Sequence, residues 1–119
     1  MSQRTQVVFP SAVRTANLSS SRVSTQGARD LSVDINVTAI TGTSVTFTVE
    51  GYDASAGTYF TLVAGVAITA AGRQVLSVGP DFPVTANVSA ARVLPLAFRI
   101  TTTGTWNPAT FTAVANFTS

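Results

Sequence analysis

Apolar and polar residues alternate along two stretches of the chain, 31–38 and 45–50, which are separated by Thr41-Gly42-Thr43. The apolar positions of the two stretches are Leu31, Val33, Ile35, Val37, Val45, Phe47 and Val49. Side chains of a β-strand point to opposite faces with a period of two, whereas the same spacing would scatter apolar residues around a helix. The pattern therefore predicts a β-hairpin that turns at Gly42 and buries one of its faces.

The rest of the sequence predicts further short strands, bounded by turn signals. We expect strands at 58–64, 73–78, 96–101 and 110–117, a hairpin loop at 103–108 and irregular structure at 86–93. Leu96, Phe98 and Ile100 should face inward. Two further sets should each share one face of their strand, namely Phe60, Leu62 and Ala64, and Phe111, Ala113, Ala115 and Phe117. The chain is thus predicted to be all-β: a single antiparallel β-sandwich or small barrel of seven to eight short strands with an extended N-terminal arm.

The first thirty residues are the least regular part of the chain. The apolar run Val7-Val8-Phe9 is followed by Pro10, which suits the end of a strand or an arm. Two interpretations are open: a first edge strand with a polar connection, or an arm that reaches a neighbouring subunit. Since 119 residues suffice for a single core, we expect an N-terminal arm at 1–12 and one sandwich domain at 13–119.

The chain lacks most of the side chains that carry catalysis. It contains no histidine, cysteine or lysine, so the usual bases and nucleophiles and the preferred ligands of zinc are missing. Glu50 and Asp53 are the one pair that a glycosidase would need, but a strand position and a turn favour solvated structural roles. A calcium site at Asp53 or Asp81 lacks the necessary cluster of acids. We therefore predict no catalytic, cofactor-binding or metal-binding residue and a protein that is not an enzyme.

The charges are few and concentrated near the N-terminus. Only 10% of the residues are charged, against roughly 25% in an ordinary domain, and all basic residues are arginine. Four of the seven arginines precede Asp30, the first acidic residue: Arg4, Arg14, Arg22 and Arg29. A nucleic-acid reader would show a denser basic stripe, so we expect contacts to an acidic protein surface and no nucleic acid.

Two further features bear on location. The longest apolar run, 62–71, is about half as long as a membrane helix needs to be, so no membrane contact is expected. The N-terminus shows no apolar segment of the kind that signal peptides carry. We therefore expect the protein to be made in a cytoplasm, or to belong to something that is assembled there.

Trp106 is the only tryptophan, and it lies in the predicted loop beside Asn107-Pro108. An aromatic side chain at a loop tip can anchor a partner, or it can fold back and cap the core. Tyr52 and Tyr59 flank the loop 53–57 and raise the same alternatives. The residues that we expect to contact a partner are Arg4, Phe9, Arg14 and Trp106.

Several segments resemble a group of small β-sandwich virion proteins of tailed bacteriophages. The resemblance lies in 31–43 (LSVDINVTAITGT), 46–62 (TFTVEGYDASAGTYFTL), 67–80 (AITAAGRQVLSVGP), 93–95 and 98–100, and it extends over about 12–117. It implies a protein of the head decoration or accessory capsid type, located on the outer surface of the virion head. The implied partners are the major capsid protein or other virion subunits, and further copies of the chain in a dimer or trimer.

The sequence is compatible with three functions. The first is a capsid decoration protein that reinforces the head through protein contacts. The second is a tail or neck component with the same fold. The third is a carbohydrate-binding module that uses Trp106, Tyr52 and Tyr59.

Overall fold

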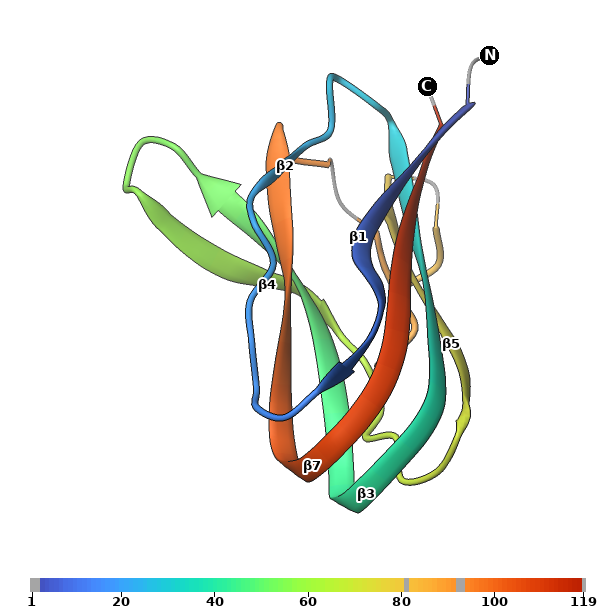
Figure 1. Cartoon of the computed structure of the whole chain (residues 1–119). Coiled ribbons are helices and arrows are strands. Elements are labelled where there is room, and N and C mark those ends of the chain that lie inside the picture. Colours follow the sequence, from blue (N-terminus) through green and yellow to red (C-terminus); the bar gives the residue numbers. More distant parts are fainter. Residues whose placement is uncertain (1–2, 81, 92–93, 119) are drawn as a thin grey trace.

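The computed structural model describes residues 3–80, 82–91 and 94–118, and these residues form seven strands and no helix (Figure 1). The strands are β1 (Gln3–Arg14), β2 (Val23–Ser24), β3 (Asp30–Asp53), β4 (Thr58–Ala64), β5 (Gly72–Gly79), β6 (Ser89–Ala91) and β7 (Ala97–Thr118). They belong to one sheet in which β5 and β6 are parallel and the other pairs antiparallel. The all-β prediction is confirmed, and the sheet does not close into a barrel.

The two longest strands, β3 and β7, form the centre of the fold. They run antiparallel from Asp30 beside Thr118 to Gly51 beside Phe98. Both bend sharply near the middle, at Gly42 with φ 123° and at Gly104 with φ 122°, as Figure 1 shows at its lower end. These backbone angles favour glycine because other residues rarely adopt them.

The hairpin predicted for 31–50 is therefore wrong. The stretch 31–37 pairs with β5 and β7, and the stretch 48–53 pairs with β4 and β7, so the two halves of β3 do not pair with each other. The hairpin loop predicted at 103–108 is also wrong, because Gly104, Thr105 and Trp106 lie within β7 and pair with β3. A glycine that permits a turn also permits a bend, and the long-range pairing of β3 with β7 decides between them.

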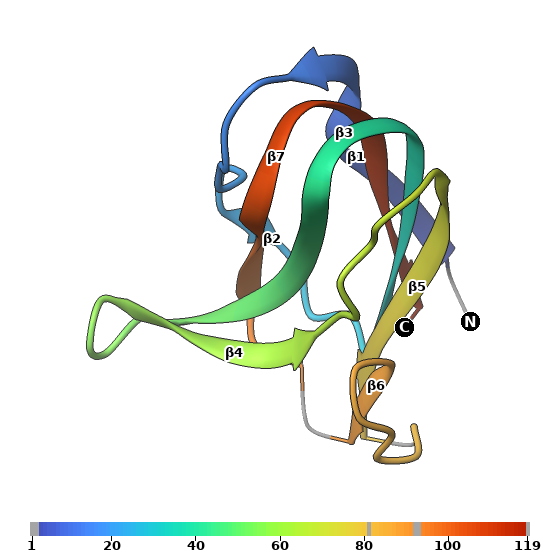
Figure 2. The same ribbon diagram turned by 90° about the horizontal axis from the view of Figure 1, so that it is seen from below.

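The two bends fold the sheet over into two layers (Figures 1 and 2). One layer holds β1, the C-terminal half of β7, the N-terminal half of β3, β5 and β6. The other holds β2, the N-terminal half of β7, the C-terminal half of β3 and β4. Between them lies the core, whose largest fully buried side chains are Phe47, Phe98, Phe111, Phe117, Leu31, Ile35, Leu76 and Ile100.

Of the three positions predicted to face inward, Phe98 and Ile100 are buried and Leu96 is not. Leu96 is 76% exposed because it precedes β7 and lies outside the sheet. In β4, a register shift opposite Val49 and Glu50 adds Leu62 as an extra residue. Both Leu62 and Val63 are consequently buried, whereas strict alternation had predicted them on opposite faces of the strand. Phe60 and Ala64 remain partly exposed.

The N-terminal segment is part of the same sheet. Residues 3–14 form β1, which pairs with the C-terminal half of β7 through two register shifts, and Phe9 is 3% exposed in the core. β1 continues through Arg14, so its end does not coincide with the predicted boundary after residue 12. Contact of this segment with a neighbouring subunit stays a prediction. The segment predicted to be irregular, 86–93, contains β6.

In the residues that the structure describes, no helix is long and apolar enough to cross a membrane.

Candidate protein-binding surfaces

Arg4 fastens the start of β1 to the rest of the chain. Its Cζ lies 4.1 Å from the centre of the Phe117 ring, within the range of a cation–π contact. Its Nη2 donates to the carbonyl oxygen of Thr25 at 3.0 Å. Thr25 follows β2, and β2 does not pair with β1, so this bond links two segments that the sheet leaves unpaired. The apolar stem of Arg4 thus covers the edge of the core.

The other three predicted contact residues meet around Phe111. The rings of Phe9 and Trp106 stand edge-on to Phe111, with centroids 5.7 and 6.0 Å away. Arg14 places its Cζ 5.3 Å from the centroids of both Phe9 and Phe111. Phe9 and Trp106 have only 3% and 7% of their surface exposed, so little of either ring is available to a partner.

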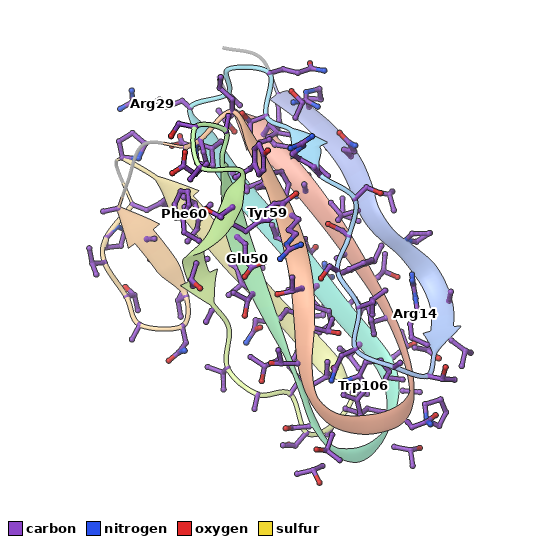
Figure 3. All side chains as sticks on the ribbon, turned by 90° about the vertical axis from the view of Figure 1, so that its left-hand side faces the viewer. Arg14, Arg29, Glu50, Tyr59, Phe60 and Trp106 are labelled. Carbon is purple, nitrogen blue, oxygen red and sulfur yellow. The ribbon has the colours of Figure 1, made fainter. Side chains whose placement is uncertain are left out.

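Trp106 caps the core at the bend of the sheet (Figure 3). Its indole Nε1 donates to Asn17 Oδ1 at 2.8 Å, which satisfies the one polar group of a buried tryptophan. The exposed loop tip predicted for Trp106 is therefore wrong, because the loop is a paired segment of β7. The alternative of a core cap is confirmed.

Tyr52 and Tyr59 lie far from Trp106, on the hairpin formed by the end of β3 and β4. Figure 3 shows Tyr59 and Trp106 toward opposite ends of the molecule. The two tyrosine rings pack with centroids 5.1 Å apart, and guanidinium groups lie over them: Arg22 over Tyr52 at 4.1 Å and Arg99 over Tyr59 at 3.7 Å. The fold thus does not bring together the three aromatic residues of the predicted sugar site. The ring of each tyrosine is also covered on one side by an arginine guanidinium group.

Arg99 also forms an ion pair with Glu50, with Nε 2.7 Å from Oε1. These two residues are directly opposite in β7 and β3. Alternation places both on the outward face, but the sequence does not reveal that β3 and β7 are neighbours. This cluster of arginine, tyrosine and glutamate was therefore missed by the sequence reasoning.

Asp53 organises the turn between β3 and β4. Its Oδ1 accepts hydrogen bonds from the Ser55 hydroxyl at 2.7 Å, from the Ser55 amide at 3.0 Å and from the Ala56 amide at 3.3 Å. The Ser55 hydroxyl first, and then the two amides, lower the pKa of Asp53 because they stabilise its charged form. Glu50 and Asp53 are thus both engaged in local structure.

Two partly exposed arginines and two exposed valines follow one another along β1: Arg4, Val7, Val13 and Arg14, here called the β1 strip. The valines lie opposite Val114 and Thr110 on the outward face, whereas the arginines lie opposite the buried Phe117 and Ala109 and cover core rings at the edge of the sheet. Val7 is 54% and Val13 65% exposed. Within the described residues, neither Arg4 nor Arg14 has a carboxylate partner. At about 3.3 Å per residue the strip is about 33 Å long, which is close to the longest dimension of the molecule, 38 Å. It combines apolar side chains with two positive charges that no acid of the described chain neutralises.

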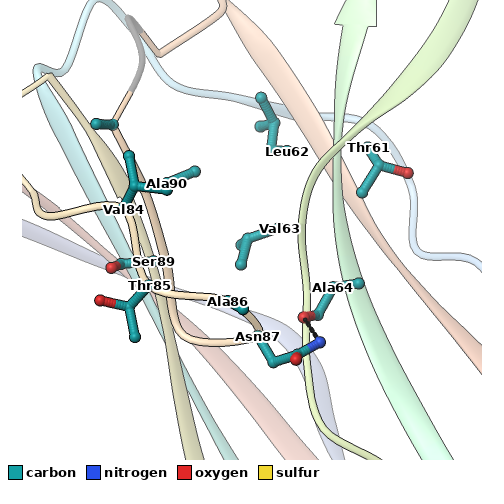
Figure 4. A pocket seen from close by; sticks show the side chains of 11 residues that line it. Thr61, Leu62, Val63, Ala64, Val84, Thr85, Ala86, Asn87, Ser89 and Ala90 are labelled. Carbon is teal, nitrogen blue, oxygen red and sulfur yellow. Dashed lines mark hydrogen bonds between the residues drawn. The ribbon is translucent and has the colours of Figure 1, made fainter.

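A second surface lies beyond β4. The hairpin of β3 and β4 projects from the body of the molecule (Figures 1 and 2). At its base, a groove of about 350 Å³ separates residues 61–64 of β4 from the segment 84–91. Asn87 Nδ2 donates to the carbonyl of Ala64 at 3.0 Å (Figure 4). Among the described residues, the lining consists of apolar, hydroxyl and amide side chains: Thr61, Leu62, Val63, Ala64, Val84, Thr85, Ala86, Asn87, Ser89, Ala90 and Ala91.

The described residues contain no cluster of three or more His, Cys, Asp or Glu side chains that would hold a metal ion. Asp81, considered above for calcium, lies outside the described residues. The surfaces of the described chain that we consider for a partner are the β1 strip and the region around β4.

The fold is a small β-sandwich built on two bent strands. No family model matches the chain, and no curated protein matches it. Among solved structures it is similar to the SPBc2 prophage-derived protein YomS, with a TM-score of 0.56 and 11% identity over 97% of this chain and 93% of that one.

Two further structures are similar over nearly the whole chain. One is a subunit of the disulfide-linked pili of Bacillus endospore appendages, with a TM-score of 0.50 and 11% identity over 98% of this chain and 87% of that one. The other belongs to the infectious bursal disease virus Gx strain, with a TM-score of 0.47 and 11% identity over 98% of this chain but 33% of that one. At these identities the first two likenesses establish a shared fold, and the third TM-score is too low for any conclusion.

Proposed function

We propose that this chain is a structural subunit of a tailed-phage particle, and more specifically a decoration protein that binds the outer surface of the head and reinforces the shell. Its partner in this proposal is the major capsid protein. In this proposal the chain acts by protein contacts and catalyses no reaction. The sequence contains no histidine, cysteine or lysine, and so it lacks the usual catalytic bases and nucleophiles.

The observation that carries the proposal is the β1 strip. A guanidinium group pairs well with carboxylates. It is also more weakly hydrated than an ammonium group, so it loses less hydration when a partner covers it. Arg4 and Arg14 lie at the two ends of the strip and have no acid within the described chain, while Val7 and Val13 supply apolar surface between them. The strip therefore fits an elongated, acidic surface that is partly apolar.

The comparison of folds supports the same class of protein. The chain shares its fold over nearly its full length with a protein described as prophage-derived. The resemblance of its segments to small virion proteins of tailed phages points in the same direction.

The test is binding of the purified chain to shells that lack it, measured by co-sedimentation. The double variant V7S/V13S should lose binding, because both side chains are exposed and contribute little to the fold. The matched control is V75S, which makes the same change at a side chain 50% exposed on β5 and should bind like the wild type. Equal binding of V7S/V13S and the wild type would contradict the proposal.

Deletion of residues 1–12 is a poor test of this surface. It would remove Phe9 from the core and most of β1 from the sheet, so a loss of binding would follow from unfolding alone. Substitution at exposed positions avoids this problem.

Fractionation of the particles into heads and tails distinguishes a head location from a tail or neck location. A decoration protein should stay with the heads after tails are detached, in a number close to that of the shell subunits or a fixed fraction of it. A tail component should be far less abundant and should travel with the tails.

A further inference from the structure

We propose that the outer face of the layer formed by β2, β4 and the paired halves of β3 and β7 binds an acidic peptide segment of a partner protein, with Arg22 as the main anchor for its carboxylates. The site lies in the region around β4, on the layer that does not contain β1. The inference does not rest on the proposed function, because it is tested with peptides and the purified chain alone.

Five side chains from four segments gather on this face. Tyr52 of β3 lies directly opposite Tyr59 of β4, and Glu50 of β3 lies directly opposite Arg99 of β7. Glu50 and Tyr52 are two residues apart in one strand, so these four side chains share a face. Arg22 immediately precedes β2, and it joins them because its guanidinium group lies over the Tyr52 ring. The sheet thus brings two cations, one anion and two aromatic rings together.

Two of the three charges form an ion pair, and the third is unpaired. Arg99 Nε donates to Glu50 Oε1 at 2.7 Å, and the two Nη groups of Arg99 have no acceptor among the described residues. Arg22 is exposed, and within the described part of the chain it has no carboxylate partner and donates no hydrogen bond. The face therefore has one positive charge in excess, on a guanidinium group that is free to donate.

Asp53, the other acid of the β3–β4 hairpin, does not neutralise Arg22. It follows Tyr52 directly, so alternation places it on the other face of the strand. Its Oδ1 accepts hydrogen bonds from Ser55 and Ala56 in the turn, and it forms no ion pair with a described arginine. The donors of Arg22 therefore stay available to a ligand.

The tyrosine rings hold both guanidinium groups in place. The Cζ of Arg22 lies 4.1 Å from the centroid of Tyr52, and that of Arg99 lies 3.7 Å from the centroid of Tyr59. Both distances are within the range of a favourable cation–π contact. A guanidinium group that is already held against a ring loses less freedom when a ligand binds it, and its N–H groups can still donate. The site is therefore partly preorganised for an anion.

The class of ligand follows from the charge and the surroundings of the site. The N–H groups of a guanidinium match the two oxygens of a carboxylate. Nucleic acid would need a denser set of cations than the single excess charge of this face. Beside the charged residues the face continues in hydroxyl groups, with Thr48 opposite Thr101 and Thr61 opposite Glu50. An acidic peptide suits this arrangement, because it offers carboxylates to the arginines and backbone groups to the hydroxyls.

The first experiment is an NMR titration of the isotope-labelled protein with a glutamate-rich peptide, and with a glutamine-rich peptide of equal length as reference. The glutamate-rich peptide should shift the side-chain Nε–Hε signals of Arg22 and Arg99, and the glutamine-rich peptide should not. No shift at any concentration, or shifts confined to Arg4 and Arg14, would overturn the proposal. Binding of DNA or of an acidic polysaccharide at this face without binding of the glutamate-rich peptide would overturn it as well.

The second experiment compares the affinities of variants for the glutamate-rich peptide. R22Q should bind at least about tenfold more weakly. R22K should recover only part of this loss, because an ammonium group keeps the charge but not the planar arrangement of donors. The matched control is R73Q, which removes the same charge from an exposed side chain of β5 on the other layer and should bind like the wild type. Equal losses in R22Q and R73Q would refute a site at Arg22, since they would show attraction to net charge alone.

E50Q should change the affinity in the opposite direction. It removes the acid that competes for Arg99, so binding of the glutamate-rich peptide should become about two- to fivefold tighter. Damage to the fold cannot produce this gain, and circular dichroism confirms that R22Q and E50Q remain folded. Unchanged or weaker binding by E50Q would contradict a site that holds carboxylates through these two arginines.

Discussion

Substitution of Gly42 tests the bend on which the two-layer fold depends. Gly42 has a φ of 123°, and a Cβ there would lie 2.6 Å from Trp106 Cα and 2.8 Å from the Thr105 carbonyl oxygen. Both are backbone atoms of the paired strand β7, so no side-chain movement can relieve the overlap. G42A therefore combines backbone strain with steric overlap.

The magnitude follows from these two contributions. A residue other than glycine at such a φ costs about 1–3 kcal/mol, and forcing an extra carbon into packed structure costs about 1–3 kcal/mol more. The sum of about 2–6 kcal/mol is a large part of the roughly 5–15 kcal/mol that stabilises a domain. At about 4 °C per kcal/mol, the Tm should fall by roughly 8–24 °C.

The matched control is G57A in the turn between β3 and β4. Gly57 also has a positive φ, 69°, but a Cβ there would meet nothing within 4 Å. It should therefore show the backbone strain alone, about 1–2 kcal/mol. Urea denaturation of the two variants and the wild type, followed by circular dichroism, gives the comparison. If G42A is no less stable than G57A, the close crossing of β3 and β7 is not present in the protein.

Three further outcomes are expected. N17A should lower the free energy of unfolding by about 1–3 kcal/mol, since it leaves the buried Nε1 of Trp106 without its acceptor; urea titration monitored by the fluorescence of this sole tryptophan measures it, and an unchanged midpoint would contradict the contact. D53N should be less stable than the wild type at pH 7, and the difference should disappear at low pH. The reason is that the pKa of Asp53 is lowered from 3.8 by folding, so its stabilising effect is full above that value and is lost as the pH falls through the lowered pKa; a difference that persists at pH 2 would refute this. E50Q should cost less than about 1 kcal/mol, because the Glu50–Arg99 pair is partly exposed, and thermal unfolding at low and high salt measures it.

The core could be predicted from the sequence, while the connections between strands could not. Alternation places Leu31, Ile35 and Phe111 inside because strand side chains change face at every residue, and all three are fully buried. The hairpin at Gly42 was wrong because local sequence shows only that a glycine interrupts the pattern. Whether the chain turns back or bends depends on β7, which lies more than fifty residues further along.

The candidate surfaces could be predicted only in part. The bias of arginine toward the N-terminus is visible in the sequence, and Arg4 and Arg14 lie on β1 without an acidic partner among the described residues. The burial of Trp106 and the stacking of Arg99 on Tyr59 could not be predicted, because both depend on pairing between distant strands. The exposed edge of β4 required the strand order, which the alternation does not contain.

The most direct test of the account is a count of this protein in purified, intact phage particles and in their separated heads and tails, by quantitative mass spectrometry. A decoration protein should be present on the heads in a number close to that of the shell subunits, or a fixed fraction of it. Absence from the particle, or recovery with the detached tails alone, would contradict the claim that this chain works by coating the head.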